Sequence, residues 1–237
     1  MTKLYVCEIS NLIEEVKENE KSLEIYCQKL EKGRIEYIMN HNKAEDRARI
    51  LGVSLLLLFV LKKAGYELEK LPDFSKLENG KPYLKEYPGL YFNLSHAGNM
   101  ITCVISDAEV GVDVETYREI KPATIERVFT DKEKKMAGFS KEGYVKLWTI
   151  KEAGAKLMGA GLSDIWNGIE ILEDENGKYI EKLNQDIRKT SRHQVIAEGC
   201  LSDSKQISYY YSVCATNTEN PETIQMVWND LNKDCFV

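Results

Sequence analysis

The stretch VGVDVE at residues 110–115 is the part of the sequence on which the predicted fold depends. Its valines alternate with Gly111, Asp113 and Glu115, so in a strand both carboxylates would lie on the face opposite the valines. Residues two apart on a strand are separated by roughly 7 Å, which lets both carboxylates approach one hard cation directly or through a water molecule. A half-buried strand with a polar outer face explains the same pattern, so the stretch gains its meaning only from its neighbours in the sequence.

A second stretch, WTIKEAGAK at residues 148–156, predicts a helix. Trp148, Glu152 and Lys156 are four residues apart and therefore share one helical face. The small residues after Glu152 leave the helix thin, so another backbone or a ligand could approach it closely. A glutamate one turn from a lysine suits a magnesium and phosphate site, although a surface ion pair on a helix is the simpler alternative.

Two loops could add contacts to an anion. Ser95 and His96 stand in SHAG at residues 95–98, directly after a predicted strand, where a turn can direct a hydroxyl, backbone N–H groups and an imidazole at a phosphate. Adjacent Ser and His rarely have the geometry of a nucleophile pair, and no GxSxG elbow occurs, so we expect anion binding rather than hydrolysis. Lys81 lies between a glycine and a proline in a restrained loop and could make a fixed cationic contact.

Periodicity along the chain predicts an α+β fold. We expect helices over residues 11–40, 43–64 and 124–160, a loop over 71–88, and strands over 90–94, 100–106, 110–114, 168–172, 193–199, 207–215 and 224–228. Helices followed by strands thus occur twice, which suggests two similar α/β halves, residues 1–107 and 108–237.

Composition disfavours several classes of protein. A net charge of −6 over 237 residues argues against broad nucleic-acid binding, which needs a basic surface. The longest apolar run, residues 53–61, is too short to span a bilayer and predicts a buried helix. No secretory signal is apparent, so we expect a cytoplasmic protein without membrane contact. The six cysteines show neither a CxxC pair nor zinc-site spacing, which indicates reduced thiols.

Four motifs in order, GKPYL, FNLSHAG, VGVDVE and WTIKEAGAK, resemble the signature set of the Sfp-type 4'-phosphopantetheinyl transferases. This family modifies the carrier proteins of peptide and polyketide synthases, as in secondary metabolite biosynthesis. The tryptophan before KEA resembles its W-KEA subgroup. The resemblance is dense over residues 80–156 and weak before residue 30 and beyond about 165.

The resemblance implies a monomer of two halves in a pseudo-twofold arrangement, with coenzyme A and Mg²⁺ in the cleft between them. Asp113, Glu115 and Glu152 would hold Mg²⁺, and Lys156 would face the coenzyme diphosphate. Arg49, Lys81 and His96 would bind the nucleotide end with its 3'-phosphate, and Ser95 would lie near the diphosphate. Lys32 and Arg34 are further candidates for the 3'-phosphate.

The implied reaction is attack of a carrier-protein serine on the β-phosphate of coenzyme A, which releases adenosine 3',5'-bisphosphate. Asp113, Glu152 and Lys156 would be the catalytic residues, with Glu152, or a water it orients, as the general base. Lys151 is the second candidate for proton transfer, although an ideal helix turns it about 100° away from Glu152. Its alternative role is a charge that faces solvent.

Other interpretations remain open at this point. A non-catalytic coenzyme A-binding protein could keep the pocket without the transfer. Another magnesium-dependent phosphotransferase is disfavoured because neither a Gx₄GK[ST] loop nor a kinase GxGxxG motif occurs. The segment DKEKKMAG at residues 131–138 could receive an acidic carrier helix through Lys132, Lys134 and Lys135, or could simply be a surface helix.

Overall fold

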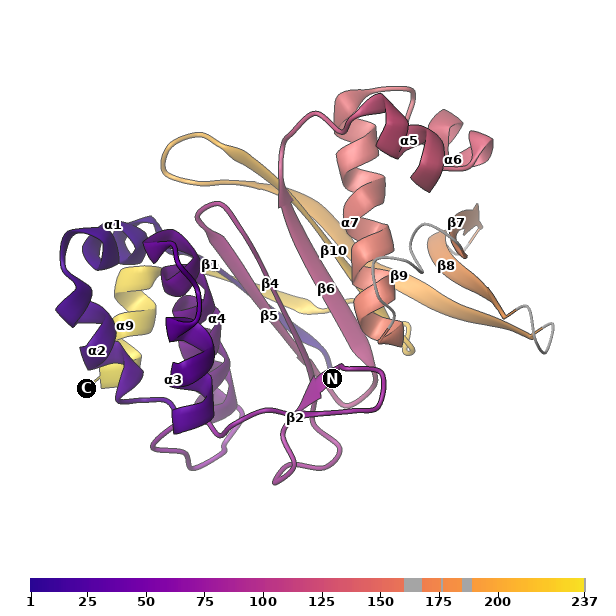
Figure 1. Ribbon diagram of the computed structural model, residues 1–237. Helices are drawn as coiled ribbons and strands as arrows, with labels where there is room; N and C mark the ends of the chain where they lie inside the picture. Colours follow the sequence, from indigo (N-terminus) through magenta and orange to yellow (C-terminus); the bar gives the residue numbers. More distant parts are fainter. Residues whose placement is uncertain (160–167, 176, 185–188, 237) are drawn as a thin grey trace.

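The two larger β-sheets lie side by side, and each is covered by one long helix (Figure 1). They meet at the strand that the sequence predicted over residues 110–114. The computed structural model describes residues 1–159, 168–175, 177–184 and 189–236. Helices and strands are mixed along the chain, which confirms the predicted α+β class. No helix in these described ranges is long and apolar enough to cross a membrane.

The first sheet has the strand order β11-β1-β5-β4. Its strands are β1 (Lys3–Glu8), β4 (Tyr91–Ala97), β5 (Met100–Ser106) and β11 (Glu222–Val227). β1 runs antiparallel to β5 and parallel to β11. Gly98, in the left-handed conformation at φ 52°, allows the tight turn from β4 to β5. The sequence predicted β4 and β5, but β1 was missed.

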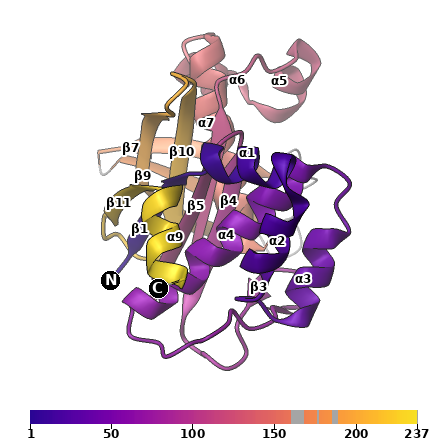
Figure 2. The same ribbon diagram turned by 90° about the vertical axis from the view of Figure 1, so that its left-hand side faces the viewer.

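Helices cover one face of this sheet, as Figure 2 shows. They are α1 (Ser10–Glu18), α2 (Glu20–Cys27), α3 (Lys32–Met39) and α4 (Ala44–Lys63). Every residue of α4 from Ile50 to Leu61 is buried, which confirms the predicted buried helix. A helix that is apolar on all sides must be covered all round, and α4 contacts α1, α2, α3 and the sheet. The loop after α4 contains the short pair β2 (Ser75–Lys76) and β3 (Pro82–Tyr83).

The second sheet has the order β6-β10-β9-β8-β7, and all its neighbours are antiparallel. Its strands are β6 (Val110–Thr116), β7 (Ile169–Asp174), β8 (Gly177–Asn184), β9 (Lys189–Ser202) and β10 (Ser208–Ala215). The helices of this part are α5 (Pro122–Val128), α6 (Asp131–Met136) and α7 (Lys141–Met158). The sequence predicted β6, β7, β9 and β10, whereas β8 was missed.

The last part of the chain returns to the first sheet. β11 pairs with β1, and α9 (Trp228–Phe236) places Trp228 and Leu231 in the core around α4. Figure 2 shows α9 in front of that sheet, beside α4. The predicted C-terminal half, residues 108–237, therefore contains a segment that packs with residues 1–107. The strand predicted at 224–228 exists, but it belongs to the first sheet.

β4 and β6 form the seam between the two sheets, and side chains replace the backbone ladder there. The Val112 N–H donates to Asn93 Oδ1 at 3.0 Å, and the Val114 N–H donates to Ser95 Oγ at 3.3 Å. The valines of β6 pack in a cluster with Leu4 and other residues of both sheets. The opposite face of β6 is therefore the one that bears Asp113, as the sequence predicted.

That opposite face lies directly against α7. A Cβ atom on Gly111 would lie 2.1 Å from the Ala153 carbonyl oxygen and 2.5 Å from the Leu157 backbone nitrogen. Such contacts are far inside van der Waals distance, so only glycine permits this approach. The thin helix predicted from the small residues after Glu152 is thus confirmed, and the space beside Gly111 is filled by the α7 backbone.

Lys151 has a structural environment that the sequence did not predict. Its ammonium lies 2.9 Å from Glu133 Oε1 and donates to the carbonyls of Val128 and Ile169, with 1% and 0% of the Lys151 and Glu133 side chains exposed. Glu133 also accepts from the Ile171 N–H. The alternative role of Lys151, a charge that faces solvent, is therefore wrong, because α6 and β7 cover that side of α7. Burial lowers the pKa of Lys151, and the charge of Glu133 opposes this effect.

We predict that Glu133→Gln lowers the free energy of unfolding by about 3 to 5 kcal/mol, because it leaves the Lys151 ammonium buried without a counter-charge. Glu142→Gln is the matched control, since Glu142 forms an exposed ion pair with Lys146 on α7, the helix that bears Lys151. We expect this control to lower the free energy of unfolding by less than about 1 kcal/mol. Urea unfolding measures both. The double variant Glu133→Gln, Lys151→Met should recover part of the loss, and equal stabilities of Glu133→Gln and Glu142→Gln would contradict the prediction.

Candidate active site

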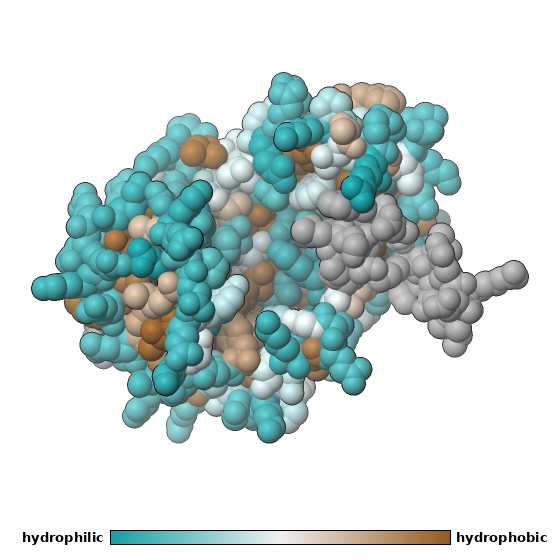
Figure 3. Space-filling model, in the orientation of Figure 1, coloured by the Kyte–Doolittle hydropathy of each residue, from teal (hydrophilic) through white to brown (hydrophobic). Residues whose placement is uncertain are grey.

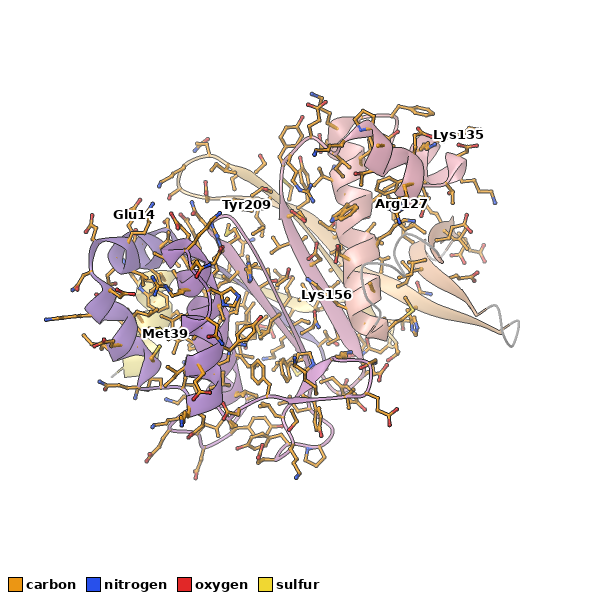
Figure 4. The ribbon with its side chains drawn as sticks, in the orientation of Figure 1. Glu14, Met39, Arg127, Lys135, Lys156 and Tyr209 are labelled. Carbon is orange, nitrogen blue, oxygen red and sulfur yellow. The ribbon has the colours of Figure 1, made fainter. Side chains whose placement is uncertain are left out.

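Asp113, Ser95 and Lys156 form one hydrogen-bonded group where β4, β6 and α7 meet. Asp113 Oδ1 accepts from Ser95 Oγ at 2.8 Å and from Lys156 Nζ at 2.7 Å. Lys156 Nζ also donates to Ser95 Oγ at 2.9 Å and to the Val112 carbonyl at 3.2 Å. Figure 4 shows Lys156 between the ribbons of β6 and α7. The structure thus brings together three of the predicted site residues from three separate motifs.

Asp113 still has an unused acceptor. Its Oδ2 atom is buried and has no hydrogen-bond partner among the described residues, and the same is true of the indole N–H of Trp148. A buried carboxylate oxygen without a donor is costly unless another group satisfies it. Asp113 Oδ2 can therefore accept a further donor or a cation.

Glu152 lies one turn before Lys156 on α7 and is half-buried. Burial, together with the negative charges of Asp113 and Glu115, raises the pKa of Glu152 to about 7, while Lys156 and Arg118 act in the opposite direction. These couplings show that the three predicted carboxylates share one electrostatic environment. Near neutral pH, Glu152 exchanges a proton readily.

Arg118 holds the third carboxylate, and sequence reasoning missed it. Its Nε and Nη2 atoms donate to the two oxygens of Glu115 at 3.3 Å and 3.1 Å. Its guanidinium carbon lies 5.6 Å from the centre of the Trp148 ring. The only signal in the sequence is an arginine three residues after Glu115, which is common on loops after strands.

The residues of this site fit a divalent cation. Carboxylate oxygens are the ligands that Mg²⁺ prefers, and Asp113, Glu115 and Glu152 supply them, with Asp113 Oδ2 unpartnered. In the described part of the chain, no group of three or more His, Cys, Asp or Glu side chains is already arranged to hold a metal ion. Asp113 and Glu115 instead each pair with a cation of the protein itself.

A cavity of about 650 Å³ opens beside this group. It is lined by Gly33, Arg34, Tyr37, Ile50, Val53, Asp73, Phe74, Lys76, Gly80, Pro82, Leu94 and His96. In Figure 3, pale and brown residues occupy the middle of the face shown, between hydrophilic rims. His96 follows Ser95 on β4, and its ring is partly exposed. The surrounding protein, and then the charges of Lys156 and Arg49, lower the pKa of His96.

The structure separates the two N-terminal candidates. Arg34 lines the cavity, with its guanidinium carbon 4.8 Å from the centre of the Phe74 ring and its Nε donating to Ser54 Oγ at 2.8 Å. Burial lowers the pKa of Arg34 to about 10, so it remains a cation at neutral pH. Lys32 is 88% exposed and pairs with Glu36. The spacing in the sequence could not distinguish them, because the choice depends on residues from α4 and the following loop.

Arg49 and Lys81 make contacts with the backbone. Arg49 Nε donates to the Gly98 carbonyl at 2.7 Å, next to His96 on the same hairpin. Lys81 Nζ donates to the carbonyls of Val110 at 3.3 Å and Leu157 at 3.0 Å, and it does not line the cavity. Burial lowers the pKa of Lys81. Its loop is thereby attached to both β6 and the end of α7, and its contact with a nucleotide stays a prediction.

Of the basic residues of α6, Lys134 is 13% exposed and pairs with Glu126 at 2.7 Å. Lys132 and Lys135 are exposed, and Figure 4 shows Lys135 at the outer edge of the molecule. The prediction that this segment contacts a carrier protein therefore rests on two lysines rather than three.

Comparison with known proteins adds an independent observation. A family model of the 4'-phosphopantetheinyl transferase superfamily matches residues 109–209, which include Asp113, Glu115, Glu152 and Lys156. The chain is 33% identical over 190 residues to 4'-phosphopantetheinyl transferase psf-1 of Bacillus pumilus, which covers 77% of each chain. It belongs to the 4'-phosphopantetheinyl transferase superfamily.

Two proteins of Bacillus subtilis are similar at lower identity. The 4'-phosphopantetheinyl transferases ffp and Sfp are each 28% identical to this chain over 191 residues, which covers 77% of the chain and 80% of each relative. The resemblance inferred from the four motifs is therefore confirmed. In this member of the superfamily, the matched region begins at β6 and extends into β10, so it contains the strand and the helix that bear the carboxylates.

We predict that the stability of the metal-free protein depends on the charge of Glu152. Its pKa is about 7 in the folded chain and near the ordinary glutamate value of 4.5 in the unfolded chain, so between these values the folded state binds more protons. The free energy of unfolding should therefore fall as the pH rises from about 4.5 to 7, by on the order of 3 kcal/mol.

Urea unfolding at several pH values, with a chelator present, measures this slope. Glu152→Gln should remove that part of the slope, whereas Glu173→Gln, an exposed carboxylate on β7, should leave it unchanged. The same slope in wild type and Glu152→Gln would contradict the assigned pKa.

Proposed function

We propose that this chain transfers the 4'-phosphopantetheine arm of coenzyme A to a serine hydroxyl of an apo acyl or peptidyl carrier protein, in a Mg²⁺-dependent reaction that releases adenosine 3',5'-bisphosphate. The observation that supports this most is the convergence of Asp113, Glu152 and Lys156 beside a cavity lined by cationic and aromatic side chains, in a member of this superfamily. Nothing in the site favours the alternative of a non-catalytic coenzyme A-binding protein.

The cavity suits the nucleotide end of coenzyme A. Its volume of about 650 Å³ lies within the range of ligand pockets. Arg34 offers a guanidinium to a phosphate, Tyr37 and Phe74 offer aromatic faces to a base, and His96 stands on the side nearest to Lys156. The diphosphate would then lie toward Lys156 and Ser95, with Arg49 near the nucleotide.

Asp113, Glu115 and Glu152 would hold the Mg²⁺ ion, which supplies charge neutralisation for the diphosphate when it is bound. Lys156 is fixed by Asp113 and Ser95, so its ammonium can balance phosphoryl charge without an ordering cost at the moment of reaction. Most catalysis of phosphoryl transfer arises from positioning and electrostatics of this kind.

Glu152 is the proposed general base. Without a metal the pKa of Glu152 is about 7, and a bound Mg²⁺ ion would lower it, so the charged carboxylate could accept the proton of a serine hydroxyl, directly or through a water molecule. Lys151, the second candidate, is unsuitable because its ammonium is buried against Glu133 on another side of α7.

The proposal includes a monomer in the cytoplasm. All the site residues come from one chain, so no second copy is required to complete the site. No two cysteines of the described residues form a disulfide, and Cys27, Cys103 and Cys214 are buried thiols, as in a reducing compartment. The carrier proteins would be those of secondary metabolite biosynthesis.

We predict that Asp113→Asn abolishes the transfer, with a fall of about 100-fold or more, because it removes a metal ligand and the partner of Lys156. The assay incubates the protein with an apo carrier protein, coenzyme A and Mg²⁺, and measures the mass of the carrier. Glu173→Gln is the control and should keep wild-type activity. Circular dichroism confirms that the variant is folded, and unchanged turnover at limiting Mg²⁺ would refute the assignment. A wild-type protein that binds coenzyme A but adds no mass to several carriers would support the non-catalytic alternative.

We predict that Arg34→Gln weakens the binding of coenzyme A about tenfold, because it removes a charged donor from the cavity. Lys32→Gln, two residues earlier but exposed, should change the dissociation constant less than about twofold. Calorimetric titration with coenzyme A measures both variants, and Arg34→Lys shows how much of the effect is due to charge alone. Equal dissociation constants of Arg34→Gln and Lys32→Gln for coenzyme A would contradict the proposal that Arg34 binds the coenzyme.

A further inference from the structure

The two carboxylates of β6 differ in how the protein's own cations hold them. Asp113 gives only Oδ1 to Lys156, and its Oδ2 has no partner among the described residues. Glu115 accepts from Arg118 through both oxygens, at 3.1 Å and 3.3 Å. A metal ion could therefore reach Asp113 through an oxygen that no cation of the protein holds, whereas each oxygen of Glu115 already accepts from Arg118.

Arg118 differs from an ordinary surface ion pair in its second contact. Its guanidinium carbon lies over the ring of Trp148, the residue one turn before Glu152 on α7, at 5.6 Å from the ring centre. The loop after β6 thus places a cation between Glu115 and the helix that bears Glu152.

We infer that Arg118 is the internal counter-ion of the metal site. It holds Glu115 while the divalent cation is absent, and a divalent cation that binds Glu115 competes with it for that carboxylate. This inference rests on the proposed function, because it requires the metal. Arg118 is a positioning residue in this account, since it acts through Glu115.

The exposure of the two cations explains why Arg118 is the one released. The Arg118 side chain is 44% exposed, so its guanidinium can be hydrated, and the Trp148 ring can keep part of its contact. The Lys156 side chain is 30% exposed and bonded to three oxygens, one of which is a backbone carbonyl. A guanidinium and Mg²⁺ repel one another at the same carboxylate, so the affinity for the metal is lowered by the free energy needed to displace Arg118.

Calorimetric titration of MgCl₂ into the coenzyme-free protein, at constant ionic strength, tests this competition. Arg118→Gln should bind Mg²⁺ about fivefold or more tightly than wild type, and Arg118→Lys should lie between them because an ammonium cannot form the bidentate pair. Lys141→Gln is the matched control. Lys141 pairs with Glu119, the next residue along the chain, in an exposed ion pair, so it removes one positive charge from the same region without a contact to the site.

The fluorescence of Trp148 gives a second readout. Saturating Mg²⁺ should change the emission of the wild type, because Arg118 moves relative to the indole ring, and the change should be absent in Arg118→Gln and in Trp148→Phe. An Mg²⁺ affinity of Arg118→Gln equal to that of Lys141→Gln would overturn the inference. If the wild type then still binds Mg²⁺ and Asp113→Asn does not, the proposed function stands without it. Absence of any Asp113-dependent Mg²⁺ binding in the wild type would overturn the metal assignment and the inference together.

Discussion

The close approach of α7 to β6 at Gly111 is the contact on which both the fold and the site depend. A side chain at this position would meet the backbone of α7 at Ala153 and Leu157, so the helix could not lie where it does. Asp113 is two residues further along the same face of the strand, and Lys156 is less than one turn beyond Ala153 on the helix. The backbone contact therefore brings Lys156 Nζ to 2.7 Å from Asp113 Oδ1. The packing of α7 on β6 thus also assembles the site.

Polar side chains join the two sheets at the seam between β4 and β6. Two buried polar side chains of β4, Asn93 and Ser95, take the place of a backbone ladder by accepting N–H groups of β6. A buried strand would otherwise contain apolar residues at such positions, because unpaired polar groups are costly there. Ser95 also donates to Asp113, so the residue that joins the sheets orients the carboxylate. The polar residues Asn93 and Ser95 of the motif FNLSHAG thus have a structural role, in addition to the ligand binding proposed for the motif.

Local sequence patterns predicted those features of the site that depend only on residues close together in the chain. Strand alternation placed Asp113 opposite the valines of β6, and helical spacing placed Glu152 and Lys156 on one face of α7. Partners distant in the sequence could not be inferred in this way. The sequence pattern predicts that β11 is a strand, but it does not indicate that β11 pairs with β1 rather than with the strands of the second sheet, which precede it in the chain. Lys151 points away from Glu152 as a helical wheel requires, yet only the tertiary structure shows that Glu133 lies on that side. Arg34 is distinguished from Lys32 by Ser54 and Phe74 in the same manner.

The electrostatics of the metal-free site explain why one of its carboxylates can act as a base. Three carboxylates in one partly buried space repel each other, and each must be neutralised for the folded state to be stable. Lys156 neutralises Asp113 and Arg118 neutralises Glu115, but no described cation pairs with Glu152. Burial raises the pKa of Glu152 to about 7, and the negative charges of Asp113 and Glu115 add to this effect. The same distribution of cations thus leaves the carboxylate proposed as the general base on α7, next to the lysine proposed to face the phosphate.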